Sequence, residues 1–123
     1  MDTLGALSAL GALAQATRLK TFRLLVAHEP DGIAAGAVAH LVGVPQNTMS
    51  THLAVLARAG LIVGDRRSRN IIYRANLERL RALTLYLVKD CCGGDPTLCA
   101  PLLADLAPYC PPPAKVTPDE CAC

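Results

Sequence analysis

Cysteine is absent from the first ninety residues of this 123-residue chain, and all six cysteines lie between Cys91 and Cys123. Tryptophan is also absent, and aromatic residues make up only 3% of the chain. Alanine, leucine and valine fill the apolar content instead, within a hydrophobic total of 52%. That composition favours a helical core over a sheet core, and the length suits a single domain.

Long apolar runs are lacking, because no stretch reaches the roughly 18 consecutive apolar residues of a membrane-spanning helix. The apolar N-terminus, MDTLGALSALGALAQA, contains Asp2 but neither Lys nor Arg, whereas a secretory signal begins with positive charge. We therefore expect a cytoplasmic protein without a membrane partner. Thiols stay reduced in that compartment, so six cysteines indicate metal binding or redox chemistry rather than a disulfide framework.

The small net charge of +2 hides an uneven distribution. Residues 1–90 carry eleven Lys and Arg against six Asp and Glu, a net of +5, whereas residues 91–123 have a net of −3. A basic body indicates an anionic partner. We expect a folded domain over residues 1–91 and a cysteine- and proline-rich tail over residues 92–123, irregular except for a short helix over residues 101–106.

Apolar periodicity predicts a mainly α-helical fold with one small β-hairpin. Leucines at spacings of three predict a first helix over residues 3–14, capped by Asp2 or Thr3. The other predicted elements are helices over 17–27, 34–42, 45–59 and 76–89, a very short strand at Ile33, and a hairpin in which LIV and NIIYR flank the turn-rich GDRRSR.

Two of these helices also predict which side chains are buried. In the helix over 17–27 the inner residues are Leu19, Phe22, Leu24 and Leu25, and the outer ones are Arg18, Lys20 and Arg23. In the helix over 76–89 the apolar face holds Leu77, Leu80, Leu83 and Leu87, and the outer residues are Glu78, Arg79 and Arg81.

The helix predicted over residues 45–59 has a polar but uncharged outer face. Its apolar stripe consists of Met49, Leu53 and Leu56. The opposite side carries short hydrogen-bonding residues: Gln46, Asn47, Thr48, Ser50 and Thr51. Such side chains can reach base edges and phosphates in the major groove of DNA. We expect His52, beside the stripe, to pack or to contact a phosphate rather than to bind metal.

The tip of the hairpin is basic, with Arg66, Arg67 and Arg69 against Asp65. Guanidinium groups pair with phosphates or enter the minor groove. Either element alone could be ordinary, an amphipathic core helix or a solvated turn. In the order helix, short helix, tight connection, polar-faced helix and basic hairpin, they predict a winged helix-turn-helix that binds double-stranded DNA.

Three separated blocks of this sequence resemble the ArsR/SmtB family of metal-responsive repressors. They are the TRL-x-x-x-x-LL run in ATRLKTFRLL, the S-x-H-L-x-x-L-x-x-AGL recognition helix, and the wing GDRRSRNIIYR; the resemblance covers about residues 5–90. It implies a homodimer paired through the first and last helices, about 3–14 and 76–91. It also implies a repressor that binds a palindromic operator and releases it when an inducer ion binds.

The family's best-known ion sites do not carry over to this chain. Arsenic-responsive members place thiols on the helix before the recognition helix, where this sequence reads GIAAGAVAHLVG. Zinc-responsive members use Asp/His and His/Glu pairs on the last helix, and NLERLRALTLYLVKD has no histidine. Other arsenic repressors of the family carry a Cys-Cys pair and a third cysteine after the last helix, and this tail resembles theirs. The resemblance thus implies that Cys91, Cys92 and Cys99 bind trivalent arsenic (arsenite, antimonite or a methylated arsenical) as inducer.

The tail residues are compatible with that assignment. Soft thiolates select soft ions, and the two glycines after Cys92 let the chain leave helical geometry. Pro96 limits the loop that returns Cys99. Three alternatives stay open: structural zinc held by Cys91, Cys92, Cys99 and Cys110, a disulfide redox switch, and inert thiols. The roles of Cys110, Cys121 and Cys123 are not assigned.

Two other classes of function explain less of the sequence. A thiol enzyme would need a phosphate-cradling loop before a reactive cysteine, and no such loop is present. A metal-buffering module would explain the tail but would leave the wing arginines and the polar helix face without a role. We therefore expect a regulator rather than an enzyme.

Overall fold

The computed structural model describes residues 1–89, 100–102, 104 and 105. The chain divides into two compact units, Met1–Tyr86 and Leu87–Cys123. The thiols predicted to bind the inducer, Cys91, Cys92 and Cys99, lie outside the described residues, as do the two glycines after Cys92.

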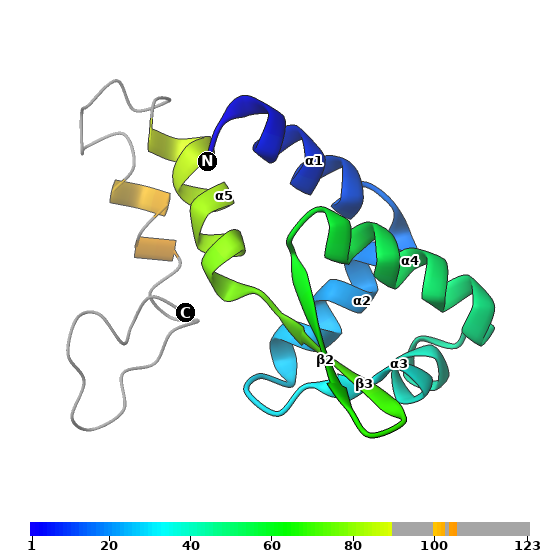
Figure 1. Ribbon diagram of the computed structural model, residues 1–123. Coiled ribbons are helices and arrows are strands. Elements are labelled where there is room, and N and C mark those ends of the chain that lie inside the picture. The colour runs from blue at the N-terminus through cyan, green and yellow to red at the C-terminus, as the bar shows by residue number, and fades with distance from the viewer. Residues whose placement is uncertain (90–99, 103, 106–123) are drawn as a thin grey trace, which may run out of the picture. The chain divides into compact units, whose positions relative to one another are not determined.

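The first unit is mainly α-helical with one small antiparallel sheet (Figure 1). The elements are α1 (Thr3–Leu13), α2 (Ala16–Ala27), β1 (Ile33–Ala34), α3 (Ala35–Val42), α4 (Gln46–Arg58), β2 (Ile62–Arg67), β3 (Asn70–Ala75) and α5 (Leu77–Lys89), which continues into the second unit. The sheet order is β1-β3-β2, so the predicted strand at Ile33 joins the hairpin as a third strand. The predicted order of elements is confirmed.

The core lies between α2, α4 and the base of the sheet. Its largest buried side chains are Phe22, Leu25, Met49, Leu53, Leu56, Leu61 and Ile62. Thr21 is the one buried polar residue among those described; its hydroxyl donates to the Thr17 carbonyl at 2.7 Å. Burial of its apolar stripe fixes the orientation of α4, so that the polar face of the helix is turned toward solvent.

Two of the burial predictions for α2 are wrong. Leu19 is 44% exposed rather than buried, because it lines a surface hollow instead of the core. Arg18 is half buried rather than outside. Its Nε donates to the Ala12 carbonyl at 2.6 Å. This bond satisfies one of the carbonyls left without an intrahelical partner at the end of α1.

Helix α1 buries its small residues and exposes its large ones. Asp2 caps it as predicted, since its carboxylate accepts from the Gly5 N–H at 2.8 Å. The inner face consists of Ala6, Ala9 and Ala12. Of the four leucines that predicted this helix, Leu4, Leu7 and Leu10 are exposed, at 77%, 59% and 39%, and Leu13 packs partly buried against the core.

Helix α5 begins against the end of α4. The Asn76 side chain donates from Nδ2 to the Gly60 carbonyl at 2.9 Å, and its backbone N–H donates to the Leu61 carbonyl at 2.8 Å. Leu83 is buried and Leu80 half buried, as predicted, whereas Leu77 and Leu87 are exposed.

Arg79 was expected outside but is partly buried. A Cβ added at Gly60 would lie 3.3 Å from Arg79 Nε, so the guanidinium covers the glycine that follows α4. The Nε atom is enclosed and has no hydrogen-bond partner among the described residues. Because Gly60 lacks a side chain, it leaves room that sequence periodicity cannot reveal.

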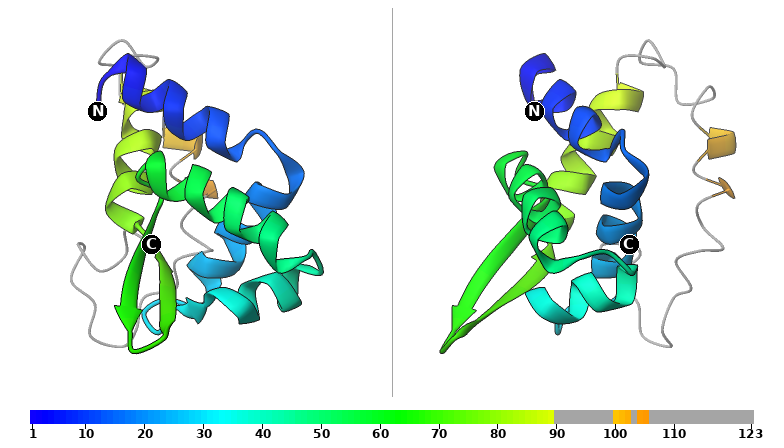
Figure 2. Two further views of the ribbon diagram at one scale, coloured as in Figure 1. Left: turned by 45° about the vertical axis from the view of Figure 1, so that its right-hand side comes forward. Right: turned by 90° about the vertical axis from the view of Figure 1, so that its right-hand side faces the viewer.

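The hairpin has a shorter turn and longer strands than predicted. Arg67 pairs with Asn70, so only Ser68 and Arg69 form the connection. Ser68 has φ +60°, which a two-residue hairpin turn requires. The hairpin therefore projects well beyond the helices, as the right-hand view of Figure 2 shows.

In the second unit, residues 100–102 and 104–105 are helical, in agreement with the predicted short helix. Among the residues that the structure describes, no helix has both the length and the apolarity to cross a membrane.

Candidate nucleic-acid interface

The polar face of α4 is exposed along its first two turns. Met49, Leu53 and Leu56 are buried, and the five predicted DNA-reading residues on the other side all face solvent: Gln46, Asn47, Thr48, Ser50 and Thr51. Pro45 begins the helix, and its carbonyl accepts from the Met49 N–H at 2.9 Å. This arrangement presents five short polar side chains on one rigid surface.

The two hydroxyl groups on this face are held by their own helix. Ser50 Oγ donates to the Gln46 carbonyl at 2.9 Å, and Thr51 Oγ1 donates to the Asn47 carbonyl at 3.3 Å. Each hydroxyl keeps its lone pairs, which can accept from the N–H of a base. To donate to a phosphate oxygen, a hydroxyl must first give up the bond to its own helix.

His52 lies at the edge of this face. Its ring is half buried, and Nδ1 is enclosed with no partner among the described residues. It belongs to no group of three or more His, Cys, Asp and Glu placed to hold an ion, since the described part of the chain contains none. The packing role expected for His52 agrees with this position.

The register of the hairpin separates the three wing arginines. Arg66 pairs with Ile71 and Gly64 pairs with Tyr73, so these side chains share one face of the hairpin. Ile71 and Tyr73 line a cleft against α4, which places Arg66 on the α4 side.

Arg67 occupies the opposite face of the hairpin. Its Nε donates to Asp65 Oδ2 at 3.1 Å in an exposed ion pair. The sequence alone does not distinguish Arg66 from Arg67, whereas in the structure they lie on opposite faces of the hairpin.

Gly64 allows the tyrosine of the return strand to lie flat on the hairpin. A Cβ at Gly64 would come within 3.1 Å of Tyr73 Cε1 and 3.0 Å of Ile71 Cγ2. A side chain at position 64 would therefore displace Tyr73 from this position.

A polar cleft of about 510 Å³ lies between α3, α4 and the wing. Gln46 and Ser50 contribute from α4, Gly36 from the first turn of α3, and Arg69, Asn70 and Tyr73 from the wing. Sequence reasoning found Gln46, Ser50 and Arg69 but missed the other three. The register places Tyr73, opposite Gly64, beside α4, whereas Asn70 pairs with Arg67 and joins the cleft lining from the end of the hairpin.

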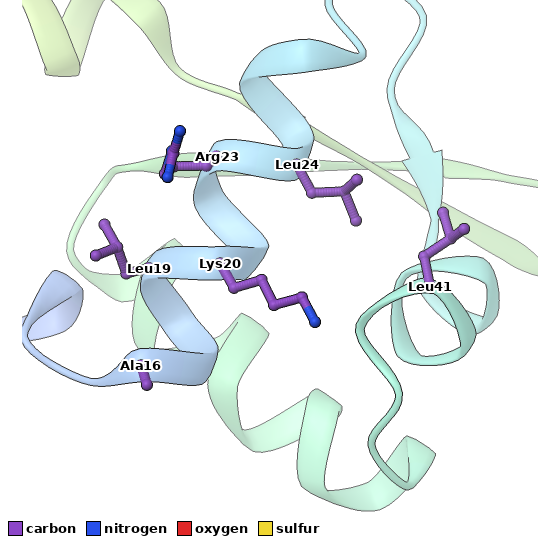
Figure 3. Close-up of a pocket in the computed structure, with 6 residues that line it drawn as sticks. All are labelled: Ala16, Leu19, Lys20, Arg23, Leu24 and Leu41. Atoms are coloured by element: carbon purple, nitrogen blue, oxygen red, sulfur yellow. The ribbon is translucent and has the colours of Figure 1, made fainter.

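A second hollow of about 510 Å³ lies between α2 and α3, away from the predicted DNA-reading residues (Figure 3). Leu24, Leu41 and the stem of Lys20 turn toward one another there, while Arg23 points away. The Lys20 ammonium donates to the Val42 carbonyl at 3.4 Å, at the end of α3.

Comparisons with known proteins agree with this geometry. The model of a helix-turn-helix domain family matches residues 13–65. An ArsR-like transcriptional regulator from Rhodococcus sp. RHA1 is 25% identical, with a TM-score of 0.67, covering 79% of this chain and 89% of that one. NolR from Sinorhizobium fredii is 32% identical, with a TM-score of 0.54, covering 65% and 81%.

A third similar structure is a homodimer. It is the winged helix-turn-helix DNA-binding domain of a possible ArsR-family transcriptional regulator from Mycobacterium bovis. It is 26% identical, with a TM-score of 0.58, and the match covers 72% of this chain and 81% of that one. A comparison with curated proteins finds no match.

The exposed polar face of α4, the basic wing and the order of elements all agree with these similar structures. The fold and family are those of DNA-binding regulators, not of enzymes. The chain belongs to the ArsR/SmtB family of winged-helix, DNA-binding transcriptional regulators.

Proposed function

We propose that this regulator is a repressor that binds a palindromic operator as a homodimer and releases it when trivalent arsenic binds Cys91, Cys92 and Cys99. The observation that carries the DNA-binding half is the continuous surface formed by the polar face of α4 and the α4 side of the wing. The thiol half rests on the sequence and on the chemistry of sulfur.

Dimerisation is supported by an apolar surface on α1 and α5. These helices are tied by a 2.7 Å hydrogen bond between Thr3 Oγ1 and the Tyr86 hydroxyl, and they lie side by side in Figures 1 and 2. Their large outward-facing residues are Leu4, Leu7, Leu10, Leu77 and Leu85. A row of exposed leucines is costly in water, and a second copy would cover it symmetrically.

A symmetric dimer presents two α4 helices to one operator. Half-sites of helix-turn-helix dimers lie about 34–36 Å apart, one turn of DNA. A change in the separation of the two α4 helices therefore weakens base contacts in both half-sites together.

The donor set of the tail suits a soft trivalent ion. Three thiolates satisfy the three bonds of arsenic(III) or antimony(III), and soft ligands select such ions over hard cations. Adjacent Cys91 and Cys92 with a third thiol seven residues later offer that set on a short loop. On binding, the ion would replace the protons of the three thiols.

The contacts between the start of α5 and the end of α4 can transmit a movement of α5 to α4, the helix proposed to read DNA. Asn76 donates its two bonds to the Gly60 and Leu61 carbonyls directly after α4, and Arg79 covers Gly60. A rearrangement that tilts α5 thus moves the end of α4. Coupling of this kind is typically about 1–3 kcal/mol, or about 5–150-fold in affinity.

The test uses operator DNA selected in vitro by the protein from a random pool. Cys91→Ser, Cys92→Ser and Cys99→Ser should each bind this DNA as the wild type does, measured by fluorescence anisotropy, but should no longer release it with arsenite. Cys123→Ser is the matched control and should still respond. If Cys99→Ser responds like the wild type, two thiols suffice and the three-sulfur site is wrong.

The same experiment separates the alternatives. A structural zinc site predicts that the serine variants lose DNA binding or stability without arsenite, because removing a ligand unfolds the site. A redox switch predicts release by an oxidant such as diamide and insensitivity to arsenite under reducing conditions.

A further inference from the structure

The cleft between α3, α4 and the wing has the chemistry of an anion site. Five residues with polar side chains line it from two elements: Gln46 and Ser50 from α4, and Arg69, Asn70 and Tyr73 from the wing. None of the residues lining it is acidic. An occupant rich in oxygen and negative charge would satisfy these groups.

The position of the cleft identifies that occupant. It separates the helix predicted to enter the major groove from the hairpin predicted to reach the next groove. A DNA backbone must pass between two elements that read adjacent grooves. We propose that the cleft seats a phosphodiester group of the operator, bound by Ser50, Arg69 and Asn70, with Gly36 forming the opposite wall; this proposal rests on the DNA-binding function above.

Gly36 is the position at which this seat can be tested without disturbing the fold. Its φ is not in the left-handed region, so its backbone does not require glycine. A Cβ there would meet only the Gln46 amide, at 3.6 and 3.8 Å, which is ordinary contact. Replacing a helical glycine also favours the helix. A side chain at this position therefore changes what the cleft holds and leaves α3 intact.

The experiment is a charge series at Gly36, read by anisotropy on the selected operator at several salt concentrations. Gly36→Lys should bind more tightly than Gly36→Gln, and Gly36→Glu more weakly, by roughly fivefold for each unit of charge in water and more where solvent is excluded. The slope of log affinity against log salt should steepen by about 1 for the lysine variant, since one more phosphate is neutralised.

Leu41 supplies the matched control, because it is on the same helix, 53% exposed, and lines the hollow on the α2 side. The series Leu41→Lys, Leu41→Gln and Leu41→Glu adds the same charges away from the cleft and should change affinity much less. Circular dichroism should show that all six variants stay folded.

A second measurement locates the phosphate. Replacing single operator phosphates by uncharged methylphosphonates should weaken the wild type most at one position in each half-site. On the operator that is uncharged at that position, Gly36→Lys and Gly36→Glu should differ in affinity no more than Leu41→Lys and Leu41→Glu do. Uncharged groups at other positions should leave the larger difference at Gly36 in place.

The outcomes separate the two proposals. If the wild type binds the operator but the Gly36 series is flat or matches the Leu41 series, the phosphate seat is wrong and DNA binding stands. If the wild type selects and binds no DNA, both are wrong.

Discussion

Helix α4 is amphipathic and helix α1 is apolar on both faces, and the two helices use their large apolar residues in opposite ways. In α4 the large residues, Met49, Leu53 and Leu56, are buried and the small polar ones face out. In α1 the alanines are buried and Leu4, Leu7 and Leu10 face out. An apolar stripe thus marks a face that must be covered, but it does not say whether the same chain or a second copy covers it.

The difference follows from what each helix packs against. Helix α4 lies over the wide core of α2 and the sheet, where large side chains fill the space. Alanines on the inner face of α1 let its backbone approach the core closely. The leucines are then left exposed, which is what the proposed dimer interface requires.

The largest expected effect comes from α4. Leu56→Ala removes a fully buried side chain and should lower the free energy of unfolding by about 2–5 kcal/mol. Urea denaturation at several protein concentrations measures this loss. It should be the same at every concentration, because the side chain stabilises the protomer itself.

Helix α1 should respond through association instead. Leu7→Glu places a carboxylate on the leucine row, twice per symmetric dimer, and should raise the dimer dissociation constant by at least roughly 30-fold, about 2 kcal/mol. Sedimentation equilibrium measures the change. Leu41→Glu, an equally exposed leucine on α3, should leave the constant unaltered. A variant that stays dimeric would break the contrast between the two helices.

The joint between α4 and α5 should show an intermediate effect. Asn76→Ala removes the bond to the Gly60 carbonyl and the acceptor for the Arg79 N–H at 3.3 Å. We expect a loss of about 1 kcal/mol in stability and a smaller response to arsenite. Thr84→Ala, exposed on the same helix, is the control. An unchanged arsenite response in Asn76→Ala would show that the Asn76 contacts do not transmit arsenite binding to α4.

The smallest stability effects belong to the wing, where two neighbouring arginines face opposite ways. Arg66→Ala and Arg67→Ala should each alter stability by under about 0.5 kcal/mol. Arg66→Ala should weaken operator binding and reduce the salt slope by about 1. Arg67→Ala should do less, since Arg67 is paired with Asp65. Equal effects would show that the register does not decide which arginine contacts DNA.

The sequence predicted the elements of the fold well because their signals are local. The Asp2 cap, the stripe of α4 and the left-handed glycines after α3 and α4 all act within a few residues. The failures are tertiary. Leu19 and Arg79 were misplaced because their neighbours, the α2–α3 hollow and the bare backbone at Gly60, lie far away in sequence.

The candidate site was predicted only in part for the same reason. Exposed residues of α4 follow from helical periodicity alone. Tyr73 could not be found, because its place beside α4 depends on a register set by a two-residue turn where the sequence suggested a longer one. Asn70 directly follows that turn, so its place in the cleft could not be found either. The tail thiols remain a prediction from composition and resemblance.

The proposed function requires that operator binding and thiol ligation oppose each other in one protein. Linkage requires the reciprocal effect: saturating operator DNA must weaken arsenite binding by the same factor by which arsenite weakens DNA binding, about 5–150-fold. The decisive measurement is therefore the arsenite affinity of the wild-type protein with and without its selected operator. A matching decrease is the predicted result, and an arsenite affinity that operator DNA leaves unchanged would contradict the account.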